Sequence, residues 1–319
     1  MSYEQTAPES QNTDGKASKG GKGRRRDAKG AKAQRDPSKM IDVARDKIAA
    51  KRWKEAVNML KRALSADRNN GVAMALLSIA YLHQRKLVDA RKLMNRALEA
   101  APMESEVHVL NGKLLHNFGE MDASANAYTH ALRLDPGCGD AYRELGVLLI
   151  DAGVLDQAME ALVMAIKLNP RDAMAFYHLG LIKKIQGEDA EAIDAYGMAV
   201  AIKPDYAEAH VNLGKIAIDR GKLDLGERAC RQAIEADPKL AQGYVNLGMV
   251  LREKKQFEEA LVAARKGAEL DPRNGAAQSN LGNVYMDLQR YQEALGCFRK
   301  AMEFQPSFAT SYFNYGKAL

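Results

Sequence analysis

The sequence comprises 319 residues, 46% hydrophobic and 28% charged, a composition that excludes a wholly disordered chain. The formal net charge is +6, yet residues 16–35 alone hold nine Lys or Arg and one acid, so the rest of the chain is close to neutral. The sequence pI of about 9.0 is therefore attributed to this segment and does not predict a basic folded surface.

Residues 1–36 are predicted to form a disordered basic tail. They are rich in Gly, Lys, Arg, Ser and Ala, so ordering them would cost more conformational entropy than burial could return. The cluster at 16–35 could make weak contacts with nucleic acid or an anionic membrane; a solvated extension without a dedicated ligand is the alternative. The sequence contains neither the apolar core of a signal peptide nor a membrane-spanning stretch, which favours a cytoplasmic protein.

From Pro37 onward the chain repeats with a period of 34 residues. Eight copies without an insertion cover 37–308, and a partial ninth fills 309–319. Small residues return at places 8 and 20 of each repeat, counted from its first residue. Place 8 holds Ala44, Ser78, Gly112, Gly146, Gly180, Gly214, Gly248 and Gly282; place 20 holds Ala56, Ala90, Ser124, Ala158, Ala192, Gly226, Ala260 and Ala294.

Each repeat is predicted to be a pair of antiparallel helices. In repeat four, apolar residues at helical spacing run through 142–149 and again through 155–165, and Gly153 lies between them as the turn. Seven of the eight repeats carry Pro at place 32, where it ends the second helix. Small residues at places 8 and 20 let the two helices approach closely. Because one hairpin cannot bury its apolar face alone, the hairpins must stack into an all-α solenoid.

These features resemble the tetratricopeptide repeat (TPR) family, and the resemblance extends over residues 37–319. It implies a right-handed superhelix in which the first helices of the repeats line a concave groove that binds extended peptides or partner helices. Residues 309–319 resemble the first helix of a ninth repeat, and a capping helix is the alternative.

Asparagine occupies place 6 in the last four repeats. By the helical period this place lies on the stripe that the resemblance assigns to the groove. A carboxamide offers one acceptor and two donors, so a ladder of them could bind the backbone of an extended peptide; the alternative is that Asn is generic to the repeat. With neighbours of mixed character, the predicted groove residues are Asn212, Asn246, Asn280, Asn314, His178, Lys215, Met249 and Arg252.

The sequence shows no pattern of a catalytic, metal or cofactor site. The six His residues and Cys138, Cys230 and Cys297 lack metal-binding spacing, and neither a phosphate-binding loop nor a nucleophile elbow occurs. Cys230 stands where other repeats have Tyr128 and Tyr196, so it is predicted to be a small buried core residue.

The predicted function is that of a non-enzymatic scaffold without cofactors, whose groove binds a segment of a partner protein. Self-association is a further expectation. The alternative is the substrate-recognition arm of a larger enzyme such as a protein O-glycosyltransferase, because TPR proteins of that kind look similar in their Asn ladders.

Overall fold

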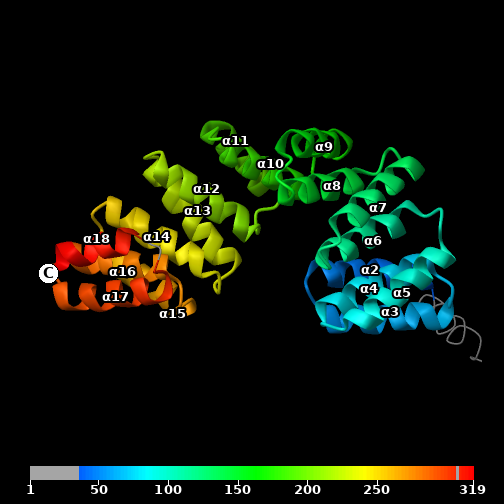
Figure 1. Cartoon of the computed structure of the whole chain (residues 1–319), viewed down its shortest axis with the longest axis horizontal. Coiled ribbons are helices and arrows are strands. Elements are labelled where there is room, and N and C mark those ends of the chain that lie inside the picture. The colour runs from blue at the N-terminus through cyan, green and yellow to red at the C-terminus, as the bar shows by residue number, and fades with distance from the viewer. Residues whose placement is uncertain (1–35, 307–308) are drawn as a thin grey trace, which may run out of the picture. The chain divides into compact units, whose positions relative to one another are not determined.

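The computed structural model describes residues 36–306 and 309–319, and its regular structure in these ranges is entirely helical. The predicted tail therefore lies outside the described residues, apart from Asp36. The helices follow one another in pairs along the chain (Figure 1). They are α2 (Pro37–Ala49), α3 (Trp53–Ala66), α4 (Gly71–His83), α5 (Leu87–Ala100), α6 (Ser105–Asn117), α7 (Met121–Leu134), α8 (Gly139–Asp151), α9 (Leu155–Leu168), α10 (Ala173–Ile185), α11 (Asp189–Ile202), α12 (Ala207–Asp219), α13 (Leu223–Ala236), α14 (Ala241–Glu253), α15 (Phe257–Leu270), α16 (Gly275–Asp287), α17 (Tyr291–Phe304) and α18 (Ala309–Ala318).

This arrangement confirms the predicted all-α class with antiparallel helix pairs. First helices such as α4 have 13 residues and second helices such as α5 have 14. Several first helices begin at a side-chain cap on place 34 of the preceding repeat. The Asn70 carboxamide accepts from the Ala73 N–H at 2.9 Å, and the Asp172 carboxylate accepts from the N–H groups of Met174 and Ala175 at 3.0 Å. These bonds satisfy N–H groups that a helix start leaves without a partner.

The turn inside each repeat requires a left-handed backbone at place 15. Gly119, Gly153, Gly187 and Gly221 hold φ between 70 and 79° there, whereas Lys51, Arg85, Lys255 and Gln289 adopt the same region with φ between 56 and 62°. Glycine enters this region without the steric cost that a Cβ brings. The backbone geometry of the turn is therefore common to all eight repeats, although only half of them use glycine.

The small residues at places 8 and 20 lie at the contact between the two helices of a repeat, as predicted. A Cβ on Gly180 would lie 2.7 Å from the Tyr196 ring, and one on Gly282 would lie 2.5 Å from the Phe298 ring. In repeat two the place-8 residue is Ser78, whose buried hydroxyl donates to the carbonyl of Ala90 at 2.7 Å. In repeats five and eight a large ring at place 24 thus leaves room only for glycine at place 8.

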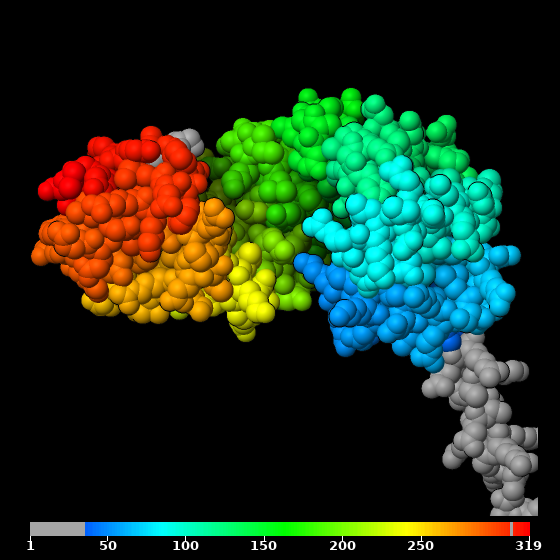
Figure 2. Space-filling model, turned by 60° about the horizontal axis from the view of Figure 1, so that its bottom comes forward, coloured from blue at the N-terminus to red at the C-terminus, as the bar shows by residue number. Residues whose placement is uncertain are grey.

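The helices group into two compact units, Met1–Leu114 and Leu115–Leu319. Within each unit successive helices pack against one another, and Figure 2 shows one face of the molecule in space-filling form. Core residues of the N-terminal unit include Leu60, Met94 and Val107, and those of the C-terminal unit include Leu162 and Phe298. None of the helices in the described ranges combines the length and apolarity needed to cross a membrane.

Candidate functional site

A cavity of about 380 Å³ opens on the face formed by the first helices α12, α14 and α16, in the C-terminal unit. We call it the anchor cavity. The first helices contribute most of its wall because the 34-residue period returns equivalent residues to one face; Gly221 and Leu223 add the turn into α13. It contains three of the predicted groove residues, Met249, Arg252 and Asn280. The whole lining is Ile218, Asp219, Gly221, Leu223, Gly248, Met249, Arg252, Glu253, Asn280 and Val284.

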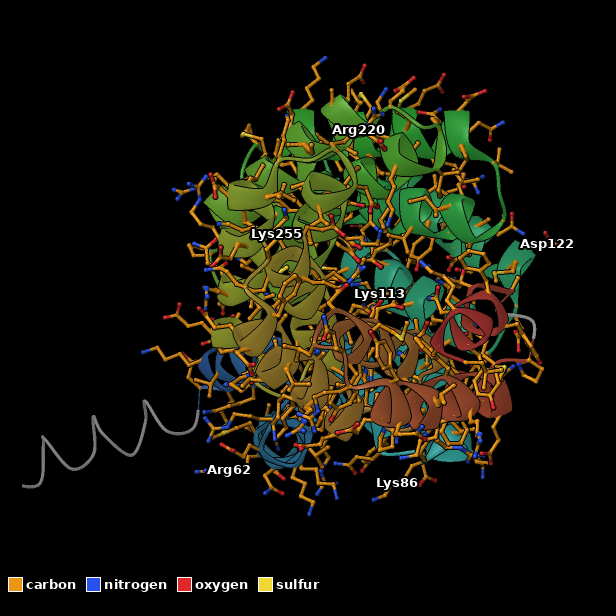
Figure 3. The ribbon with its side chains drawn as sticks, turned by 90° about the vertical axis from the view of Figure 1, so that its left-hand side faces the viewer. Arg62, Lys86, Lys113, Asp122, Arg220 and Lys255 are labelled. Carbon is orange, nitrogen blue, oxygen red and sulfur yellow. The ribbon has the colours of Figure 1, made fainter. Side chains whose placement is uncertain are left out.

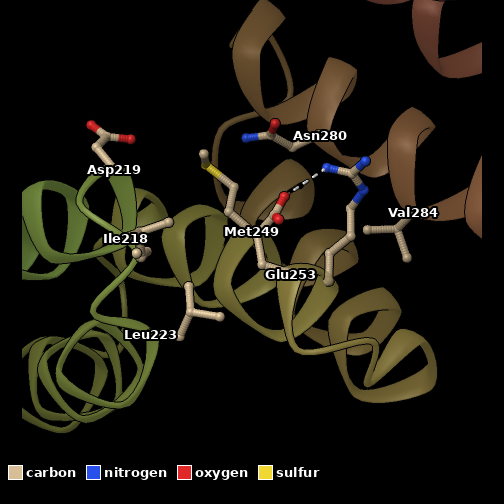
Figure 4. Close-up of a pocket in the computed structure, with 10 residues that line it drawn as sticks. Ile218, Asp219, Leu223, Met249, Glu253, Asn280 and Val284 are labelled. Carbon is tan, nitrogen blue, oxygen red and sulfur yellow. Dashed lines mark ion pairs between the residues drawn. The ribbon is translucent and has the colours of Figure 1, made fainter.

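The lining combines apolar surface with a few polar groups that converge on the opening. Met249 extends across the centre of the cavity, with Ile218 and Leu223 on one side and the Asn280 carboxamide on another (Figure 4). Such a mixture is typical of binding sites, in which apolar walls supply burial and a few polar groups fix orientation.

Ion pairs between helices hold the charged residues of this face in place. The Arg252 guanidinium pairs with Asp287 on the following first helix and lies 3.5 Å from Glu253. Lys215 pairs with Asp219 on its own helix. Lys215 is thus engaged within α12 and does not line the cavity, in contrast to Met249 and Arg252.

The four asparagines of the ladder have different environments. Asn212 donates to the Tyr177 hydroxyl at 3.2 Å, and Asn314 donates to the Asn283 carbonyl oxygen at 2.8 Å in a second, smaller cavity of about 150 Å³ that Arg252 also lines. Among the described residues, none hydrogen-bonds the half-buried Asn280 carboxamide. Asn280 is therefore the ladder member with its donors and acceptor available inside the anchor cavity.

Asn246 is a correction to the expected ladder. It is completely buried, where a solvent-facing amide was predicted. Its amide nitrogen donates to the Val211 carbonyl at 3.3 Å, and its oxygen accepts from the Gln242 amide at 2.8 Å. The bond to Val211 ties α14 to α12 and the bond from Gln242 lies within α14, so the carboxamide stabilises the stack and presents no group to a ligand.

His178 lies apart from both cavities, beside a buried charge network. Its neighbour Arg143 is only 9% exposed and donates to Asp172 at 2.6 Å and to Glu144 at 3.2 Å. Burial lowers the pKa of His178; Glu144 opposes this shift and Arg143 adds to it. The buried Nδ1 atom has no hydrogen-bond partner, so protonation there would place a charge without solvation.

Sequence reasoning predicted Met249 but missed the other apolar residues of the anchor cavity, Ile218, Leu223 and Val284. Leu223 begins α13, and the prediction considered only one stripe along the first helices. The turn geometry could have indicated Leu223. The residue two positions after the left-handed turn residue begins the second helix, and it lies at the mouth of the anchor cavity. Cys230, by contrast, is fully buried as predicted, and burial raises the pKa of its thiol to about 12, which makes it unreactive at neutral pH.

The lining of the anchor cavity suits the binding of a ligand. Within residues 36–306 and 309–319, no group of three or more His, Cys, Asp or Glu is placed to hold a metal ion. The anchor cavity is lined by one base, Arg252, and two acids, Asp219 and Glu253, and its lining contains no Ser, Thr or Cys.

No curated protein matches the sequence. Solved structures with similar folds include the APC/C hetero-tetramer Cut9-Hcn1 (TM-score 0.69, 16% identity, covering 84% of this chain and 52% of that chain). The present chain therefore spans about half the length of that relative. PilF of Pseudomonas aeruginosa gives a TM-score of 0.59 at 15% identity over 69% of this chain and 97% of its own. YrrB, described as a TPR protein with an unusual peptide-binding site, gives 0.52 at 23% identity over 61% of this chain and 100% of its own. Likeness at such identities shows the fold.

Models of the tetratricopeptide repeat match the sequence directly, in six segments. They cover residues 47–114, 110–165, 180–217, 207–240, 229–262 and 275–308, each with the description tetratricopeptide repeat or TPR repeat. The matched segments include both compact units and agree with the helix pairs and the small-residue contacts. The chain belongs to the tetratricopeptide repeat family.

Proposed function

We propose that this TPR protein is a non-catalytic scaffold that binds an extended, partly apolar segment of a partner protein along the first-helix face of α12, α14 and α16. The observation that supports it is the anchor cavity, in which apolar surface surrounds the free carboxamide of Asn280. A cavity of about 380 Å³ has the size of a site for one large side chain and its flanking backbone. The peptide-binding site named for the structurally similar YrrB agrees with this reading.

The proposed contacts divide by type. Met249, Ile218 and Leu223 would bury an apolar side chain of the partner, and Asn280 would hydrogen-bond its backbone. The cavity lining contains two acids, Asp219 and Glu253, and one base, Arg252. The opening therefore favours a partner segment with a neutral or basic residue beside the apolar side chain that enters the cavity. Asn246 has no part in the proposal because it is buried.

The test is a peptide selection followed by affinity measurements. Peptides selected from a random library on the wild-type protein are titrated against Met249→Arg, which fills the cavity, and against Val262→Arg, which changes a 71% exposed residue of α15. We expect Met249→Arg to weaken binding by about tenfold or more, since it removes roughly 1.4 kcal/mol or more of apolar contact. Val262→Arg should leave the affinity unchanged.

A second pair of variants separates binding from packing. Asn280→Ala should weaken peptide binding about fivefold through one lost hydrogen bond and leave the melting temperature nearly unchanged. Asn246→Ala should instead lower the free energy of unfolding by about 1 kcal/mol, because it removes the buried bond between α14 and the Val211 carbonyl of α12. Peptides that keep their affinity for a folded Met249→Arg protein would overturn the proposal.

A further inference from the structure

The near-neutral total of the repeats conceals a segregation of charge along the chain. Residues 37–114 hold 15 Lys or Arg and 8 Asp or Glu, a net charge of +7, whereas residues 115–206 hold 7 and 14, a net charge of −7. The interpretation that only the tail is basic is therefore wrong. The helices of the N-terminal unit form a basic surface of their own, independent of residues 1–35.

The basic residues of this unit gather on the second helices α3 and α5 and on the adjoining turns. Arg62 and Lys86 project outward from them (Figure 3). Most of these bases have no ion pair with a carboxylate among the described residues. Ion pairs of the unit join three bases, Arg45, Lys47 and Arg52, to the acids Asp42, Glu55 and Glu106. The exposed bases without an ion pair include Lys51, Lys54, Lys61, Arg62, Arg68, Arg85, Lys86, Lys92 and Arg96.

A cleft of about 460 Å³ lies within this basic surface, between α3 and α5. We call it the basic cleft. Its apolar floor is formed by Leu64, Leu77, Leu93 and the ring of Tyr81. Its rim carries Lys92 and Arg96, one helical turn apart on α5, and a single acid, Asp89.

Tyr81 is flanked by two further cations. The Lys86 ammonium lies 5.3 Å and the Lys61 ammonium 6.0 Å from the centre of its ring. With Lys92 and Arg96, four bases therefore face one acid around an apolar floor. Because the cations occupy the approach to the ring, Tyr81 is a poor platform for stacking a nucleic-acid base. A flat lipid surface would not reach a recessed floor either.

The corresponding cleft in repeat seven shows that the basic character does not come from the repeat geometry. It has a volume of about 610 Å³ and lies at the same places, between α13 and α15. Its three bases, Arg231, Arg265 and Lys266, face two acids, Glu259 and Glu269, and Arg231 pairs with Glu259 at 3.4 Å. The linings of the two clefts have the same net charge, and the basic cleft differs by the additional cations Lys61 and Lys86 beside Tyr81.

From the unpaired bases around an apolar floor, we infer that the basic cleft is a second docking site, for an acidic protein segment that carries aliphatic or aromatic side chains between its carboxylates. The carboxylates pair with Lys61, Lys86, Lys92 and Arg96, and the apolar side chain enters between them. Charge complementarity selects the segment and speeds its association, and the floor distinguishes it from a purely anionic polymer. The basic cleft is separate from the anchor cavity. Disproof of this second docking site would therefore leave the proposed function unaffected.

The test measures fluorescence anisotropy of labelled probes on the full chain at low ionic strength. The first probe is a short peptide of Asp and Glu with Leu and Phe four residues apart, and the second has Ser in place of Leu and Phe. The test variant is Lys61→Ala, Lys92→Ala and Arg96→Ala together. The control is Arg231→Ala, Lys266→Ala and Lys300→Ala, which removes the same charge from places 25 and 26 of later repeats; the third test residue, Lys92, stands at place 22.

We expect the first probe to bind, and the test variant to weaken it about tenfold, since three exposed pairs of roughly 0.5 kcal/mol each are lost. The control variant should bind like wild type, and the Ser probe should bind more weakly than the first. Circular dichroism checks that both variants remain folded. Equal losses in the two variants would show unspecific charge attraction and overturn the inference. Binding of an oligothymidylate and of phosphatidylserine vesicles is compared in the same way. The inference is also overturned if the test variant weakens binding of either of these and leaves peptide binding unchanged. It is likewise overturned if the test variant abolishes only self-association.

Discussion

His178 shows how one residue couples folding to pH. Burial lowers the pKa of its imidazole below the value of about 6.5 found in an unfolded chain. Below that pH the unfolded state therefore binds more protons than the folded state. The contribution of His178 to the free energy of unfolding is thus full above pH about 6.5 and declines as the pH falls. The unpartnered Nδ1 atom and the nearby Arg143 disfavour protonation, and the carboxylates of Glu144, Asp151 and Asp172 offset this only in part.

The prediction is that His178→Asn flattens this part of the pH dependence. Asn stands at the same place in repeats six to nine, so the fold should accept it. Urea unfolding of both proteins at several pH values between about 7.5 and 5 should show the wild type losing more free energy of unfolding than the variant. Parallel curves for the two proteins would contradict the assigned role of His178.

At the same scale, the sequence predicted which residues recur and could not predict which of them are exposed. Asn246 and Asn280 share place 6, yet one is buried between α12 and α14 and the other lines a cavity. The difference depends on whether a long neighbour such as Gln242 folds over the amide, and on the distance to the carbonyl of the preceding first helix. The 34-residue period predicts neither the conformation of the neighbouring side chain nor this distance. Cys230 was predictable because its place is buried in every described repeat that fills it with Tyr.

The contact between the two helices of a repeat depends on complementary sizes at places 8 and 24. Gly146 meets Leu162, Gly180 meets Tyr196 and Gly214 meets Cys230, each within 2.9 Å of where a Cβ would stand. The helix positions themselves were predictable, because proline, the turn glycine and the apolar spacing mark both ends of each helix. The pairing of particular large and small residues required the structure, since it depends on how far apart the two axes lie.

Adding one methyl group at Gly282 should therefore be costly. Its Cβ would lie 2.5 Å from the Phe298 ring, which is fully buried and cannot move aside. Gly282→Ala should lower the free energy of unfolding by about 1–3 kcal/mol, the range for overpacked cores. Thermal or urea unfolding measures the loss.

A double variant distinguishes this clash from a general intolerance of change in α16. Gly282→Ala with Phe298→Leu recreates the buried pair of Ala44 and Leu60 at places 8 and 24 of repeat one, so it should be more stable than the sum of the two single variants predicts. The matched control is Gly296→Ala in α17, where an added Cβ would meet nothing within 4 Å. Because alanine favours the helix, this control should keep or raise stability, by up to about 1 kcal/mol. A strictly additive double variant would contradict the steric explanation.

Across the molecule, stability comes from contacts between neighbouring elements. Helices that pack closely are separated by at most one other helix along the chain. In such a chain, folding is the sum of local repeat stabilities and interfaces, so a severe defect should unfold its own neighbourhood first. The two compact units, Met1–Leu114 and Leu115–Leu319, give this expectation a natural boundary.

A buried charge placed in one unit tests whether unfolding remains local. Ala90 in α5 and Ala294 in α17 occupy the same place 20 and are both completely buried, so Ala90→Arg and Ala294→Arg impose matched defects on the N-terminal and C-terminal units. Burying an unpaired cation costs several kcal/mol, on the order of 3–5 by comparison with broken buried ion pairs. Hydrogen exchange read by mass spectrometry should show loss of protection in helices α3–α5 for Ala90→Arg and in α16–α18 for Ala294→Arg, with protection retained in the other unit. Loss of protection in both units for either variant would mean that the repeats fold as one cooperative body and that nearest-neighbour contacts do not limit unfolding.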